Sequence, residues 1–251
     1  MTAPLRTEQY AMFELGLTGT NEGNPYADVN LEADFIHVSS GRKITVGGFY
    51  RGNGTYAVRF MPTDAGNWSY TTRSNDVELN GITGQLTACP AGKDNHGRVL
   101  RATDVLKGKD RELYGSELAY RFCYEDGTPY QPYGTTCYAW TNQAPEVQDR
   151  TIETLKTAPF NKIRMCVFPK FYDFNNTDPE LFAYEGSMEE GFDHSRFNEA
   201  FFKNLDYRIA QLTELGIEAD IILLHPYDKP KWGFSKMTKA EDEFYLTYMA
   251  R

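Results

Sequence analysis

Apolar and polar residues alternate with a period of two along much of residues 8–90. Alternation of this kind places one face of a strand in a core and the other in solvent. Turn-forming segments at 39–41, 51–54 and 64–67 separate the runs. Short strands at this spacing predict an antiparallel β-sandwich over residues 1–90. The alternating runs include Val29, Leu31 and Ala33, then Tyr56, Val58 and Phe60, and then Trp68, Tyr70 and Thr72.

Trp68 has two interpretations in that sandwich. Its place in an alternating run predicts that it fills the core, and an exposed platform for a sugar ring is the alternative. Residues 91–129 are polar and rich in glycine, which predicts a linker and a hairpin. The hairpin would join Ala119–Tyr124 to a strand beginning at Tyr130, with its turn at Glu125–Gly127.

The pattern changes from Tyr130 onward, where short apolar runs alternate with segments of helical period. The order β-α-β-α-β-α, in which no antiparallel hairpin is expected, predicts a parallel sheet. A barrel or a doubly wound sheet would fit, and no glycine-rich nucleotide motif follows any strand. The predicted strands are Pro132–Tyr138, Lys162–Phe168 and Ala219–Leu224, and the predicted helices are Glu146–Ala158, Phe197–Leu215 and Lys239–Arg251.

Residues 130–251 hold only three such βα units. A closed (β/α)8 TIM barrel needs eight units over about 250 residues. We therefore expect a multidomain β plus α/β chain, in which a sandwich precedes the N-terminal, incomplete part of a barrel. The remaining units would come from a further segment or a separate chain. A compact three-layer domain is the alternative.

Composition narrows the classes of partner. The net charge of −9 with scattered Lys and Arg argues against nucleic acid. No apolar run approaches the roughly 20 residues of a membrane span, and the N-terminus lacks the apolar core of a signal peptide, so we expect a cytoplasmic protein.

The four cysteines form no CxxC pair, and neither a metal nor a cofactor is expected. The 17 Tyr, 16 Phe and 3 Trp suit a carbohydrate binder or a large core.

Residues that could bind or act on a substrate lie on the predicted strands and just after them. Arg164 shares a strand face with Cys166, and an inward cation needs a carboxylate partner. It would either hold a catalytic carboxylate ionised or pair structurally beneath a helix. His225 ends the third strand, where it could donate to a sugar hydroxyl or serve structurally. Asp228 lies in the same region without an evident partner.

Four aromatic residues also follow strand ends, and they could line a sugar subsite or simply pack loops. They are Tyr138, Trp140, Tyr227 and Trp232. Glycosidic hydrolysis generally needs two carboxyl groups, and no convincing pair is visible. Asp220 is a poor candidate because it faces away from His225. The aromatic-rich segment 169–194 is long enough to be functional, and its acidic spacing does not match a calcium loop.

Three stretches resemble apiosidase-like glycoside hydrolases, which are (β/α)8 barrels related to clan A. They are EDGTPYQPYGTTCYAW (125–140), NKIRMCVFPK (161–170) and FDHSRFNEAFFKNLDYRIAQLTELGIEADIILLHPYDKPKWGF (192–234). RFMPTDAGNWSY (59–70) is similar to the immunoglobulin-like domain that often precedes such barrels. The resemblance implies that Arg164 supports the nucleophile and that His225 binds the sugar. It also implies that both catalytic carboxylates lie beyond Arg251, so none is expected within the chain.

We therefore expect the N-terminal portion of a retaining glycoside hydrolase, inactive by itself. One alternative is a non-catalytic carbohydrate-binding protein that uses the sandwich or the aromatic cluster. An adhesion module that binds through the sandwich is a third hypothesis.

Overall fold

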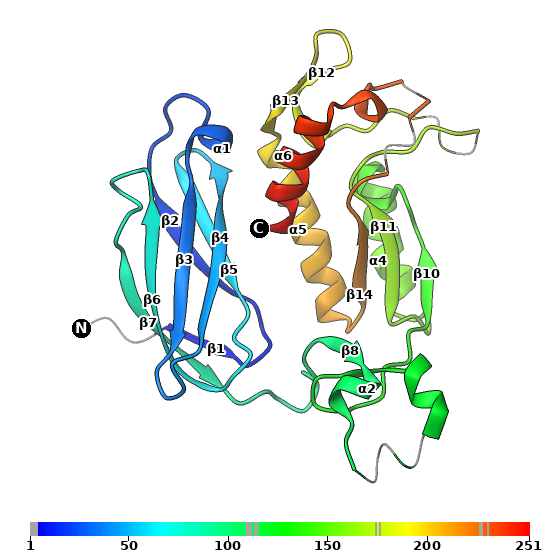
Figure 1. Ribbon diagram of the computed structural model, residues 1–251. Coiled ribbons are helices and arrows are strands. Elements are labelled where there is room, and N and C mark those ends of the chain that lie inside the picture. The colour runs from blue at the N-terminus through cyan, green and yellow to red at the C-terminus, as the bar shows by residue number, and fades with distance from the viewer. Residues whose placement is uncertain are drawn as a thin grey trace. The chain divides into compact units, whose positions relative to one another are not determined.

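The computed structural model describes residues 5–108, 112, 115–173, 175, 177–225, 228–229 and 231–251. The chain divides into two compact units. One unit comprises Met1–Gln131 together with Arg251, and the other comprises Pro132–Ala250. Figure 1 shows a β-rich first unit and a mixed α/β second unit.

The first unit is built on a seven-stranded sheet in the order β1-β7-β6-β3-β4-β5-β2. Every neighbouring pair is antiparallel except β1 with β7, which is parallel. The antiparallel prediction is wrong for this edge strand because alternation carries no information about direction. The elements are β1 (Leu5–Glu8), β2 (Phe13–Thr18), α1 (Pro25–Asp28), β3 (Leu31–His37), β4 (Lys43–Gly52), β5 (Thr55–Phe60), β6 (Gly66–Ser74) and β7 (Thr83–Cys89).

Strand β4 belongs to both halves of this sheet. Its first part pairs with β3 as far as Gly47, and its second part pairs with β5 from Gly48. A Cβ atom at Gly48 would lie 2.5 Å from side-chain atoms of Leu31, so a residue without a side chain is needed at this bend. The two halves can thereby face each other across a common core.

Aromatic rings fill that core. The ring of Phe60 stacks on Phe35 at 3.9 Å between centroids and meets Trp68 edge-on at 5.1 Å. Trp68 is fully buried, and its Nε1 donates to the carbonyl of Asp64 over 3.0 Å. The prediction that Trp68 fills the core is confirmed.

The segment after the sheet holds β8 (Val99–Arg101), α2 (Ala102–Val105), the 3-10 helix η1 (Gly115–Tyr120) and β9 (Phe122–Tyr124). The predicted turn is confirmed, because the N–H of Tyr124 donates to the carbonyl of Thr128 and Gly127 adopts a φ of 90°. Residues 119–120, predicted as strand, belong to η1, and the named strand that pairs with β9 is β8.

The second unit is organised around a parallel sheet in the order β10-β11-β14, which is the order of the strands along the chain. The prediction of a parallel sheet is confirmed. The elements are β10 (Gly134–Thr136), the 3-10 helix η2 (Trp140–Asn142), α4 (Pro145–Leu155), β11 (Lys162–Cys166), β12 (Tyr184–Ser187), β13 (Gly191–Phe197), α5 (Glu199–Glu214), β14 (Glu218–Ile222), the 3-10 helix η3 (Phe234–Lys236) and α6 (Lys239–Ala250).

One prediction for this unit is wrong: β12 and β13 form an antiparallel hairpin. Phe197, predicted to begin a helix, ends β13. The helix begins one residue after Asn198, whose side chain accepts hydrogen bonds from the backbone N–H groups of Ala200 and Phe201. An Asn cap of this kind overrides the apolar period, because it satisfies N–H groups that the helix leaves unpaired.

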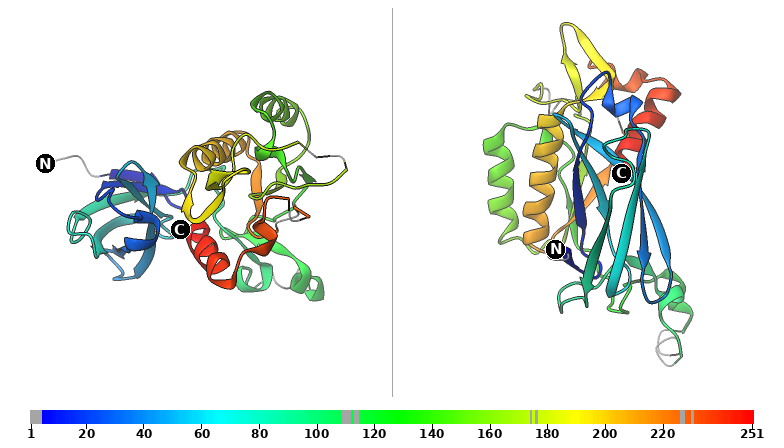
Figure 2. Two further views of the ribbon diagram at one scale, coloured as in Figure 1. Left: turned by 90° about the horizontal axis from the view of Figure 1, so that it is seen from above. Right: turned by 90° about the vertical axis from the view of Figure 1, so that its left-hand side faces the viewer.

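Helices α4 and α5 lie side by side on one face of the parallel sheet (Figure 2). Ile163 and Met165 of β11 are fully buried, whereas Arg164 between them is exposed. Since successive residues of a strand point to opposite faces, the apolar pair lies on the helix-covered face and Arg164 on the other. The sheet therefore has one apolar face and one charged face.

Candidate functional site

The carboxyl ends of the three parallel strands meet at one edge of the sheet. Where the strands end, the N–H of Cys166 donates to the carbonyl of Tyr138 over 2.8 Å, and that of Val167 to the carbonyl of Ile222 over 3.2 Å. These bonds keep the segments after β10, β11 and β14 aligned. The predicted site residues that the structure describes lie on these strands or on the segments that follow them.

Arg164 and Asp220 form an ion pair on the charged face of the sheet. They are register partners on β11 and β14, and Nε of Arg164 lies 2.9 Å from Oδ2 of Asp220. The hydrogen bond and charge of Asp220, with a smaller contribution from Tyr138, raise the pKa of Arg164. The side chains remain 53% and 31% exposed. The carboxylate partner expected for Arg164 is therefore present, and it lies away from the helices.

Tyr138 stands between this ion pair and a buried lysine. Nζ of Lys170 lies 4.7 Å from the centroid of the Tyr138 ring, within cation–π range. Lys170 is 2% exposed, and burial lowers its pKa. The Tyr138 side chain is 38% exposed, so part of its surface stays accessible. Sequence reasoning missed Lys170, although a lysine directly after a buried strand and among aromatic residues was a usable signal.

His225 and Asp228 follow β14 in very different environments. His225 is exposed, three residues beyond the last residue of the strand. Asp228 is 1% exposed, and its Oδ2 accepts a long hydrogen bond of 3.4 Å from the N–H of Ser235. Its backbone carbonyl accepts from the N–H of Lys231 over 2.6 Å. His225 is thus accessible to a ligand, whereas Asp228 holds a turn. Tyr227 lies outside the described residues.

Trp140 and Trp232 are buried, at 3% and 5% exposure. Nε1 of Trp140 donates to the carbonyl of Gln148 over 3.2 Å, and Nε1 of Trp232 to Oδ1 of Asp178 over 2.9 Å. A ring that stacks on a sugar must present a face to solvent, and neither indole does so in this structure. Loop packing, the alternative interpretation, accounts for both. A sequence cannot show on which side of a loop an indole packs.

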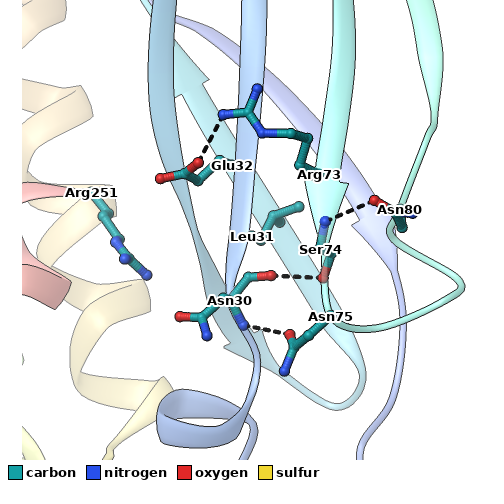
Figure 3. Close-up of a pocket in the computed structure, with 8 residues that line it drawn as sticks. All are labelled: Asn30, Leu31, Glu32, Arg73, Ser74, Asn75, Asn80 and Arg251. Atoms are coloured by element: carbon teal, nitrogen blue, oxygen red, sulfur yellow. Dashed lines mark hydrogen bonds and ion pairs between the residues drawn. The ribbon is translucent and has the colours of Figure 1, made fainter.

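A depression of about 440 Å³ lies on the first unit, beside β3 and β6 (Figure 3). Its polar groups largely bond to one another. The N–H of Asn30 donates to Asn75, that of Ser74 to Asn80, and Oγ of Ser74 to the carbonyl of Asn30. These bonds hold the turn after β6 against β3, so the polar residues of the depression have a structural role.

The described residues contain no group of three or more His, Cys, Asp or Glu side chains placed to hold a metal ion. Among the helices that the structure describes, none is long and apolar enough to cross a membrane.

Comparison with solved structures finds a close relative of known architecture. A crystal structure of a candidate glycoside hydrolase from Bacteroides vulgatus ATCC 8482 aligns with a TM-score of 0.85 and 42% identity over 98% of this chain. The chain spans 46% of the length of that relative. A further structure, described as a glycoside hydrolase, aligns over 52% of this chain and 28% of its own length, with 14% identity and a TM-score of 0.35. No curated protein matches.

Two family models match the chain. Residues 6–75 match a domain of unknown function, DUF5060. Residues 116–251, more than half of the chain, match the apiosidase-like catalytic domain. The chain therefore belongs to the apiosidase-like family, and it is similar to glycoside hydrolases in sequence and in fold.

Proposed function

We propose that this chain is the N-terminal part of a retaining glycoside hydrolase that acts on O-glycosyl bonds of a plant or microbial saccharide. The sandwich would be an accessory domain of immunoglobulin type, and the second unit would supply the first three βα units of a (β/α)8 barrel. Membership of the apiosidase-like family supports this assignment, as does the greater length of the Bacteroides relative.

The charged face of the parallel sheet is the structural observation that most favours a barrel. In open α/β sheets helices cover both faces, and both faces are apolar. Here the face opposite α4 and α5 presents Lys162 and Arg164 from β11, paired with Glu218 and Asp220 from β14. Such a face suits the interior of a barrel near a polar substrate site.

Arg164 would act on a catalytic carboxylate that residues after Arg251 provide. Asp220 keeps the guanidinium oriented, and the exposed part of Arg164 is free to stabilise the ionised nucleophile. His225, exposed at the carboxyl edge, would donate a hydrogen bond to a sugar hydroxyl, and Tyr138 would line the same subsite.

The two carboxyl groups of the complete enzyme would lie about 5–5.5 Å apart, as a retaining mechanism requires. One would protonate the glycosidic oxygen while the other attacks the anomeric carbon and forms a glycosyl-enzyme. The first would then take a proton from water, which attacks the same carbon and releases the sugar with retained configuration.

The test compares this 251-residue chain with a chain extended to the length of the Bacteroides relative. Both are assayed on a panel of aryl glycosides, with the anomeric configuration of the first-formed product followed by NMR. We expect turnover with retention from the extended chain and none from the shorter one. Turnover by the shorter chain, or inversion by the extended one, would contradict the proposal. Oligosaccharide binding by both chains without turnover would favour the carbohydrate-binding alternative.

A further inference from the structure

Asp178 joins the two long loops that follow β11 and β14. Its Oδ1 lies 2.6 Å from Nζ of Lys231 and accepts a hydrogen bond of 2.9 Å from Nε1 of Trp232. Both donors belong to the loop after β14, and Asp178 belongs to the loop after β11. One carboxylate oxygen thus holds two consecutive side chains of the neighbouring loop.

Aromatic rings pack against the two donors of this contact. Nζ of Lys231 lies 4.6 Å from the centroid of the Phe171 ring. The Trp232 ring meets Phe171 and Phe182 edge-on, each at 6.1 Å between centroids. The Lys231 side chain is 21% exposed and the Asp178 side chain 43%. The lysine end of the ion pair is thus packed among rings while the carboxylate end remains open to solvent.

Lys231 also contacts Asp228 of the same loop through its backbone. The N–H of Lys231 donates to the carbonyl of Asp228 over 2.6 Å. The carboxylate of Asp228 faces the N–H of Ser235 at the start of η3. Restraining Lys231 therefore also restrains Asp228, to which its backbone is hydrogen-bonded.

We propose that Asp178 is a positioning residue that holds the loop after β14 in the conformation that binds the sugar, and this rests on the function proposed above. Asp178 would touch no substrate itself. It would act through Lys231 and Trp232, and a sugar would then meet a loop after β14 that is already ordered.

Substitutions of Asp178 and Trp232 distinguish the contribution of the ion pair from that of the hydrogen bond. Asp178→Asn removes the charge but leaves an oxygen that can accept from Trp232, Asp178→Glu keeps the charge, and Trp232→Phe removes only the hydrogen bond. Glu180→Gln is the matched control, because Glu180 is an exposed carboxylate on the same loop. Hydrogen exchange of peptides covering 223–236 is measured in the 251-residue chain, and KM and kcat are measured in the extended enzyme.

We expect Asp178→Asn to speed exchange of the loop about tenfold and to raise KM about tenfold with little change in kcat. Trp232→Phe should have a smaller effect of the same kind, Asp178→Glu should recover most of the loss, and Glu180→Gln should match the wild type. If Asp178→Asn matches Glu180→Gln in both exchange and KM, the positioning role is wrong. An inactive wild-type extended chain would instead refute the proposed function.

Discussion

Nε of Arg208 in α5 donates a hydrogen bond of 2.8 Å to Oε1 of Gln148 in α4, and both side chains are 4% exposed. The Arg208 guanidinium also pairs with Asp149 at 2.6 Å. The amide nitrogen of Gln148 in turn donates to the carbonyl of Gln143 over 2.6 Å, just after η2. This buried network joins both helices of the parallel sheet to the segment that follows β10, so the candidate site depends on helix packing beneath it.

Replacing Arg208 should therefore cost stability. Arg208→Met leaves the buried oxygen of Gln148 without its charged donor, and we expect the free energy of unfolding to fall by about 1–3 kcal/mol. Urea unfolding followed by far-UV circular dichroism measures this. Lys203→Met is the control, because Lys203 is 63% exposed and pairs with Glu199 on the surface of the same helix; its effect should stay within about 0.5 kcal/mol. Equal effects of the two substitutions would show that the network contributes nothing.

The bend of β4 gives a second prediction. Gly48→Ala should destabilise the first unit by about 1–3 kcal/mol, because the added methyl group would overlap the Leu31 side chain. Gly16→Ala on β2 is the matched control, because a Cβ there meets no atom within 4 Å among the described residues. Thermal unfolding of both variants, followed by the near-UV signal of the sandwich aromatics, distinguishes a steric effect from a general effect of replacing glycine.

The start of α6 predicts a dependence on pH. Backbone and side-chain hydrogen bonds from Thr238, and then one from His194, hold the pKa of Glu241 at about 2 rather than its usual 4.5. A lowered pKa in the folded state stabilises the fold above the unfolded value, and this stabilisation disappears as the pH falls from about 4.5 to about 2.

Glu241→Gln should therefore be less stable than the wild type at neutral pH, and the difference should shrink as the pH falls through that range. Urea unfolding at a series of pH values measures the effect. Glu243→Gln, on the same helix and 67% exposed, should show a much smaller difference. A gap between Glu241→Gln and the wild type that stays constant down to pH 2 would contradict the assignment.

Arg164 should matter for turnover far more than for stability. Because both side chains of its ion pair are partly exposed, Arg164→Met should leave the free energy of unfolding close to that of the wild type. In the extended enzyme we expect kcat/KM to fall about 100-fold or more, since the nucleophile loses a preorganised cation. Lys162→Met removes the neighbouring cation on the same strand face and serves as the control. Similar kinetics for both variants would exclude a special role for Arg164.

The sequence predicted the features that depend on local period. Alternation within residues 8–90 located β3, β4, β5 and β6, and the apolar runs near Lys162 and Ala219 located β11 and β14. The partner of Arg164 required register, which period alone does not determine. Asp220 becomes that partner only because β11 and β14 align residue for residue.

The sequence missed features that depend on tertiary packing. The hairpin of β12 and β13 lies in a segment whose aromatic residues gave no clear period, and Asn198 begins the next helix where the apolar spacing had included Phe197. The two buried tryptophans, Trp140 and Trp232, look the same in sequence as exposed sugar platforms. Their indole partners come from residues 8 and 54 positions away, and local patterns do not report such contacts.

Because β4 pairs with β3 as far as Gly47 and with β5 from Gly48, a single strand joins both halves of the seven-stranded sheet. Disrupting either half removes pairing from the same strand. The sheet should consequently unfold in a single cooperative transition, with no stable state in which only one half survives.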